Sequence, residues 1–198
     1  MEGFFMCYQP IANSETGHIV GMEALLRWKH KEFGVVPPGI FIPWLEMEPC
    51  FFELGNWIIE QALTDGMEVR KLRPDFVVNV NISATQLENH GFRQAVVDIL
   101  KKTKFPPEYL CIELTERCKN MDIAFLKNEL EYFRKLGIKI AIDDFGTGNA
   151  TLNLLTELPI DELKVDMSFV RGIQESKPNQ VLVQAVVSCA CLLYTSPS

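Results

Sequence analysis

A regular alternation of short apolar runs and amphipathic segments constrains this chain more than any other feature. Apolar runs bounded by turn residues predict strands at residues 18–28, 76–83, 109–115, 138–143 and 162–166. Patterns with helical period predict helices at residues 52–72, 92–103, 122–136, 151–158 and 180–187. Such alternation requires mostly parallel strands joined by helical crossovers, so the sequence predicts an α/β protein.

Polar side chains occur near the end of almost every predicted strand. Side chains two residues apart on a strand share a face. The polar groups that share a face in this way are Glu23 with Arg27, Asn79 with Asn81 and Ser83, Glu113 with Thr115, and Lys164 with Asp166. Asp143 and Asp144 close the remaining strand. A doubly wound sheet gathers ligand groups at one switch point, whereas a (β/α)8 barrel collects them from many strand ends. We therefore predict a (β/α)8 barrel. That fold takes about 250 residues, so a chain of 198 residues is short by one or two βα units.

Composition excludes some classes of partner. The chain has 26 acidic and 19 basic residues, a formal net charge of −7, so binding to a DNA or RNA duplex through a basic surface is not expected. The six cysteines form no C-x-x-C pair and are expected to be buried thiols of a reducing compartment. The chain begins without a basic signal-peptide region, and its longest apolar stretch, residues 181–194, is too short to span a bilayer. We expect a cytoplasmic domain, whose longer parent protein could be membrane-anchored.

The last eight residues, CLLYTSPS at 191–198, can be back-translated into the transposon end used to build sequencing libraries. The helical pattern from Gln180 reaches them without a stop signal. We expect residues 1–190 to be one partial domain and residues 191–198 to be a non-native read-through tail. The alternative is a natural, frayed terminus.

The strongest local motif is IAIDDFGTG at residues 140–148. Neighbouring carboxylates on a strand cannot face the same way, so one can bind a metal inside the barrel while the other reaches a second metal or a water. An aspartate after a strand can instead cap the next helix, and Asp-Phe-Gly is also a magnesium site in kinases. The kinase alternative is rejected because neither a Gly-rich loop nor a His-Arg-Asp element precedes the motif.

Two further strands add oxygen ligands. Glu113 lies within an apolar run, and a buried carboxylate must be paired or metal-bound. Glu116, one step past that strand, could bind, brace the loop after Asp143 or begin a solvated turn. The inward amides of Asn79 and Asn81 fit either metal ligation or hydrogen-bonded core asparagines.

Cationic groups complete the pattern. Glu23 and Arg27 suit a metal and a phosphate held next to each other, with exposed surface ions as the alternative. Lys164 could orient a water or offset phosphate charge, or form a simple inward ion pair. Together these residues fit metal-assisted phosphoester hydrolysis better than acyl or glycosyl transfer.

In their order and spacing, these segments resemble the EAL-domain family, whose name comes from Glu23-Ala24-Leu25. The resemblance is carried by QPI at 9–11, EALLRW at 23–28, NVNIS at 79–83, ELTE at 113–116, DDFGTG at 143–148 and LKVD at 163–166. It implies a modified TIM barrel that hydrolyses the bacterial messenger cyclic di-GMP to linear pGpG with two Mg²⁺ or Mn²⁺ ions. It also implies a homodimer in the complete protein and allows an upstream sensor or GGDEF domain.

The resemblance assigns a role to each matching position. It implies four metal ligands, Glu23, Asn81, Glu113 and Asp143, and places Asp144 at the second metal and the attacking water. Lys164 would position that water, with Asp166 beside it. Gln9 and Arg27 would hold the dinucleotide, and Glu116 would anchor the loop after Asp143. The physical chemistry agrees, because two cations lower the pKa of a water and neutralise phosphate oxygens.

Two departures from the family pattern bear on activity. Asn149-Ala150-Thr151 replaces the usual Tyr-Ser-Ser, and the strands that would supply a further catalytic glutamate and close the barrel are absent. We expect a C-terminally truncated fragment of a cyclic di-GMP phosphodiesterase, itself inactive. The alternatives are a catalytically inactive cyclic di-GMP receptor, favoured by the altered loop, and a scaffold for protein contacts.

Overall fold

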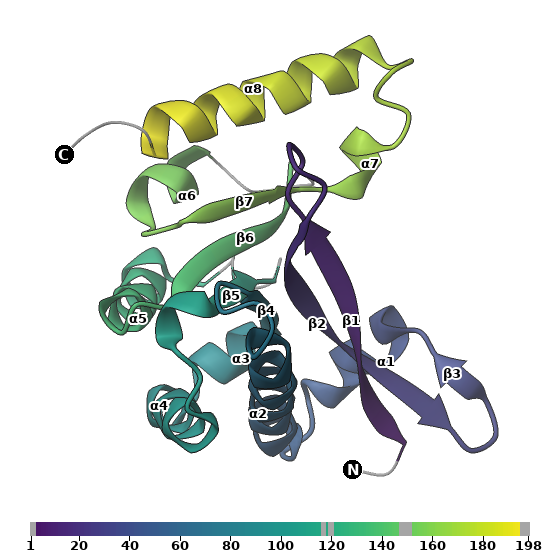
Figure 1. The fold of residues 1–198 in the computed structure, drawn as a ribbon, viewed down its shortest axis with the longest axis vertical. Coiled ribbons are helices and arrows are strands. Elements are labelled where there is room, and N and C mark those ends of the chain that lie inside the picture. Colours follow the sequence, from purple (N-terminus) through teal and green to yellow (C-terminus); the bar gives the residue numbers. More distant parts are fainter. Residues whose placement is uncertain (1–2, 116–117, 119–120, 147–151, 195–198) are drawn as a thin grey trace.

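The computed structural model describes residues 3–115, 118, 121–146 and 152–194 (Figure 1). Its strands are β1 (Phe4–Ala12), β2 (Ile19–His30), β3 (Gly34–Val36), β4 (Val77–Ile82), β5 (Leu110–Leu114), β6 (Lys139–Phe145) and β7 (Glu162–Val165). Its helices are α1 (Pro38–Leu45), α2 (Phe51–Arg70), α3 (Ala84–Leu87), α4 (Phe92–Thr103), the 3₁₀ turn η1 (Pro107–Tyr109), α5 (Ile123–Lys135), α6 (Leu152–Glu157), α7 (Met167–Val170) and α8 (Lys177–Tyr194).

The strands form one mixed sheet in the order β1-β2-β4-β5-β6-β7, with β3 paired to β2 (Figure 1). β2, β4, β5, β6 and β7 run parallel, while β1 and β3 are antiparallel to β2. All five predicted strands and all five predicted helices are present, and the predicted α/β fold with a central parallel sheet is confirmed.

The edge strand β1 was not predicted. It contains Pro10, which has no backbone N–H to donate and is therefore disfavoured in a strand that has neighbours on both sides. In the sheet β1 has a single strand neighbour, β2, so the proline is tolerated there. Helix α1 was not predicted either, because Pro43 lies inside it and a proline usually interrupts a helix.

The core lies between the central strands and the helices packed on them. Val78, Val80 and Ile82 of β4 are fully buried, and the Val78 side chain packs against Gly66 of α2. A Cβ added at Gly66 would meet Val78 Cγ2 at 2.5 Å, so the glycine permits close contact between α2 and β4. Because neighbouring residues on a strand face opposite ways, this contact turns the asparagines of β4 to the other side of the sheet.

Helix α5 follows its sequence signals closely. The Asp122 carboxylate caps its start by accepting the Phe125 N–H at 2.8 Å, and Leu126, Leu130 and Phe133 are buried. Gly137 after the helix has a φ of +92°, the left-handed conformation expected of a glycine at this position.

Two other expectations concern the cysteines and the membrane. Cys111 and Cys118 are buried, but Cys50 is exposed at the start of α2, so the prediction of a buried thiol is wrong for Cys50. None of the helices described here combines the length and the apolar character needed to span a bilayer.

Candidate metal centre

Parallel strands bring their carboxyl-terminal ends to one edge of the sheet. In register, Glu23 of β2 lies opposite Asn79 of β4, and Asn81 of β4 lies opposite Glu113 of β5. The shared period of two places these four side chains on the same side of neighbouring strands. The predicted convergence of polar groups therefore occurs in the structure.

Three carboxylates meet at this edge. Glu23, Glu113 and Asp143, from three different strands, each offer an oxygen within 4.8 Å of the other two. The Glu113 side chain is completely buried, whereas those of Glu23 and Asp143 are 14% and 26% exposed. The site is thus closed beneath Glu113 and open on the side of Asp143.

Lys164 of β7 reaches into the middle of these carboxylates. Its Nζ lies 2.8 Å from Glu23 Oε2, 2.8 Å from Glu113 Oε2 and 3.6 Å from Asp143 Oδ1. Burial opposes its charge, but the surrounding carboxylates outweigh burial and raise the pKa of Lys164 above its ordinary value. Lys164 therefore stays an ammonium ion and forms the inward ion pair that the sequence left as an alternative.

The asparagines of β4 each donate to a glutamate of a different neighbouring strand. Asn81 Nδ2 donates to Glu23 Oε1 at 2.9 Å, and Asn79 Nδ2 donates to Glu113 Oε1 at 2.7 Å. Both glutamates are thereby held at one oxygen by an amide and at the other by Lys164.

Burial dominates the protonation of Glu113. Loss of solvent raises its pKa to about 7, against the opposing effects of Lys164 and the Asn79 amide, which favour the ionised form. A carboxyl group with this pKa is poised to exchange a proton for a metal ion near neutral pH.

A β-bulge interrupts β6 at Asp143 and Asp144. The β6–β7 register shifts between Ile142 and Phe145, where three steps along β6 match two along β7. Asp144 has a φ of +50°, a left-handed conformation that few residues other than glycine and asparagine adopt readily. Asp143 is half-buried and Asp144 is exposed, so the two neighbouring carboxylates face different ways, as the sequence predicts.

Asp166, just past β7, has a structural partner. Its carboxylate accepts the Ser168 N–H at 2.8 Å at the start of α7 and also accepts the Ser168 hydroxyl. These hydrogen bonds hold the pKa of Asp166 below its ordinary value.

The two predicted substrate-binding residues lie at different distances from the carboxylates. Gln9 of β1 is exposed and lies directly opposite Glu23 in the β1–β2 ladder. Arg27 donates to the Leu26 carbonyl at 3.0 Å and lines a cavity of about 370 Å³ together with Asn81. Apolar side chains from α1 and α2, including Ile42, Phe51 and Ile58, complete its wall. Sequence reasoning missed these apolar residues because their periodicity is that of ordinary core helices. Glu116 lies outside the described residues.

The donor set suits a hard divalent cation. All candidate ligands are carboxylate or amide oxygens, the donors that Mg²⁺ and Mn²⁺ prefer. One ammonium faces three carboxyl groups, so the cluster retains negative charge that a divalent cation would neutralise. The residues present therefore fit a metal ion.

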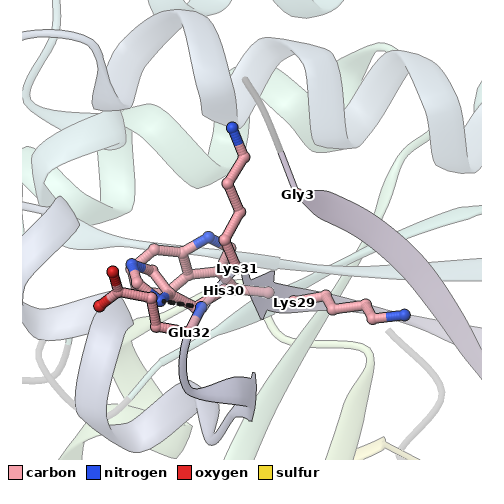
Figure 2. Close-up of a pocket in the computed structure, with 6 residues that line it drawn as sticks. Gly3, Lys29, His30, Lys31 and Glu32 are labelled. Carbon is pink, nitrogen blue, oxygen red and sulfur yellow. Dashed lines mark hydrogen bonds between the residues drawn. The ribbon is translucent and has the colours of Figure 1, made fainter.

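A second pocket lies at the far end of β2 and is not a comparable site. Figure 2 shows the side chains of Lys29, Lys31 and Glu32 diverging from it. His30 Nδ1 accepts the Glu32 N–H at 3.1 Å, so its imidazole stabilises the turn after the strand. Seven residues of strand, about 23 Å at ~3.3 Å per residue, separate His30 from Glu23.

Comparison with known proteins places this geometry in context. The model of the EAL domain family matches residues 2–193. The chain is 34% identical over 192 residues to a protein of Pseudomonas aeruginosa named cyclic di-GMP phosphodiesterase PA2567, covering 97% of this chain and 33% of that protein. The chain spans about a third or less of the length of the curated relatives that it matches.

Solved structures of EAL proteins also resemble the chain, in sequence and in fold. The EAL enzyme Bd1971, in a form with cAMP and cyclic di-GMP bound, superposes with a TM-score of 0.89 at 35% identity, over 97% of this chain and 53% of that one. The PaMucR phosphodiesterase, in complex with c-di-GMP, gives a TM-score of 0.88 at 31% identity, over 96% of this chain and 78% of that one.

Proposed function

Because this chain belongs to the EAL domain family, we propose that it forms the metal-binding part of a phosphodiesterase that hydrolyses cyclic di-GMP to linear pGpG. The observation that carries the proposal is the meeting of Glu23, Glu113 and Asp143 around Lys164 at one edge of the sheet. All three proteins described above are named for action on, or complexes with, this dinucleotide.

The proposed cofactor is a pair of Mg²⁺ or Mn²⁺ ions. Glu23, Asn81, Glu113 and Asp143 would hold them, with Asp144 contributing from the outer side of the bulge. When bound, the ions would lower the pKa of a water molecule and neutralise phosphate oxygens.

The chain's own residues would then orient the reactants. The Lys164 ammonium, already held by Glu23 and Glu113, would donate a hydrogen bond to the attacking water. Arg27 would bind a phosphate through its guanidinium fork, and Gln9 would contact the dinucleotide from the edge strand. As water adds to phosphorus, the ester bond to the leaving 3′ oxygen breaks and that oxygen takes up a proton, which gives linear pGpG. We propose that Asp166, which caps the start of α7, lies beside this water and that Glu116 anchors the loop after Asp143.

The surroundings of this unit are also proposals. We infer a complete protein that carries further βα units and forms a homodimer, and in which a sensor or GGDEF domain could precede this unit. Residues 1–190 would be its partial EAL domain, and residues 191–198 a read-through tail.

The proposed function is tested by incubating the complete protein with cyclic di-GMP and Mg²⁺ or Mn²⁺ and separating the products by chromatography. We expect linear pGpG, and none after chelation of the metal. A complete protein that binds cyclic di-GMP without releasing pGpG would be a receptor instead of an enzyme. A protein that binds none would leave only the scaffold function.

A further inference from the structure

One polar group beside the metal centre has a role that the carboxylate cluster alone does not explain. The Asn79 side chain is 2% exposed, and its Oδ1 is buried without a hydrogen-bond partner among the residues that the structure describes. A buried, unpaired oxygen lowers the stability of a fold, so Asn79 is a poor choice for packing alone.

The register explains where its amide points. Asn79 lies one strand period before Asn81 on the same face of β4, since its neighbour Val78 packs against α2 on the other face. Asn81 donates across to Glu23 on β2, whereas Asn79 donates the opposite way, to Glu113 on β5. The Asn79 amide therefore lies beneath the cluster.

The orientation of the amide follows from its partner. In the structure the NH₂ group of Asn79 donates to Glu113 Oε1, so the carbonyl oxygen at the other end of the amide faces away. That carbonyl is the atom left without a partner. The unpaired oxygen is thus the direct consequence of aiming the donor at Glu113.

We propose that Asn79 is a positioning residue for the metal centre. Its N–H holds Glu113 Oε1 at 2.7 Å, which turns Oε2 toward Lys164, at 2.8 Å, and toward the space shared with Glu23 and Asp143. Asn79 itself ligates no metal. This inference rests on the proposed function, because it concerns the same metal site.

The experiment measures Mn²⁺ affinity by electron paramagnetic resonance and the midpoint of urea denaturation in the same preparations of the full chain. Asn79→Leu keeps a similar volume but removes both the donor and the unpaired oxygen. We expect Mn²⁺ affinity to fall by about 10- to 100-fold, the usual effect of losing a group that orients a metal ligand. The denaturation midpoint should change little, because removing the unpaired Asn79 oxygen offsets leaving Glu113 Oε1 without its donor.

Asn56 supplies a matched control. It lies on α2, and its Oδ1 is also buried without a described partner. Asn56→Leu should change the denaturation midpoint without changing Mn²⁺ affinity. Asn79→Ser, which is smaller and too short to reach Glu113, provides a second variant if Asn79→Leu does not fold, and it should also bind Mn²⁺ more weakly.

The outcomes separate this inference from the proposed function. An unchanged Mn²⁺ affinity in the folded Asn79 variants overturns the positioning role, as does a loss of affinity that only parallels a loss of stability. If the unsubstituted full chain and the complete protein both fail to bind Mn²⁺, the proposed metal site itself is wrong. In the complete protein, kcat should fall in Asn79→Leu with little change in KM, and excess Mn²⁺ should restore part of the activity.

Discussion

The β4–β5 pair and the β6–β7 pair both contribute to the metal centre, but they position their side chains differently. β4 and β5 keep an unbroken register from Val78 opposite Leu110 to Ile82 opposite Leu114. β6 and β7 are interrupted by a bulge at Asp143 and Asp144. Glu113 of the regular pair is completely buried, while Asp143 of the bulged pair is 26% exposed.

The difference shows two ways to bring charge to a strand end. A regular ladder offers one inward side chain every second residue, and the hydrogen bond from Asn79 then holds Glu113 firmly. A bulge offers two consecutive carboxylates, at the expense of a left-handed residue. The regular pair supplies one firmly held carboxylate, Glu113, and the bulged pair supplies two consecutive carboxylates, Asp143 and Asp144.

The largest expected effect comes from removing one anionic oxygen from each pair. In the complete protein, Glu113→Gln and Asp143→Asn should each abolish Mg²⁺-dependent cleavage of cyclic di-GMP, because an amide keeps the shape but loses the charge that a hard cation requires. Product chromatography checks this prediction. Thermal denaturation should change little in either variant, because weakening the ion pair to Lys164 offsets the relief of repulsion among the carboxylates. Full activity in either variant would contradict the assignment of that residue as a ligand.

The next effect separates orientation of the water from binding of the substrate. Lys164→Ala in the complete protein should lower kcat by about 10²-fold or more, the scale of losing one positioned electrostatic group. Arg27→Ala should instead raise KM, by about tenfold or more, since a phosphate contact is present before and during the reaction. Steady-state kinetics distinguishes the two.

Binding measurements provide the control for this pair. With Ca²⁺ as a non-catalytic substitute, calorimetry should detect binding of cyclic di-GMP by Lys164→Ala and weaker binding by Arg27→Ala. The reverse result would exchange the two assignments.

The smallest effect concerns the bulge itself. Asp144→Gly and Asp144→Ala remove the same carboxylate, but only glycine adopts a φ of +50° freely. The glycine variant should be more stable to urea than the alanine variant by about 1 kcal/mol, and both should lose activity to the same extent. Equal stability of the two variants would mean that residue 144 leaves the left-handed conformation when the carboxylate is removed.

Much of the framework could be predicted from local patterns. The five predicted strands and five predicted helices are present, and Gly137 has the predicted left-handed conformation. The convergence of Glu23, Asn81, Glu113 and Asp143 followed from the period of two and the parallel order of the strands. Their roles as metal ligands remain predictions.

Other features depended on neighbours that no local pattern identifies. β1 was missed because Pro10 is acceptable only at a sheet edge, and its edge position depends on the assembled sheet. The strand pattern did not distinguish Asn79 from Asn81, and only the family resemblance singled out Asn81, yet the two donate to glutamates on opposite sides. For Lys164, both a catalytic role and an ion pair were open, and the structure gives it two carboxylate partners at 2.8 Å.

The sequence by itself determined the five central strands, the helices between them and the side of each strand that carries oxygen ligands, because these depend on periods of two and 3.6 residues along the chain. The tertiary structure decided which groups pair and which stay apart. Hydrogen bonds and ion pairs form only within about 3 to 4 Å, and such distances are set by the strand register, by the bulge at Asp143 and Asp144, and by the close approach of α2 to β4 at Gly66.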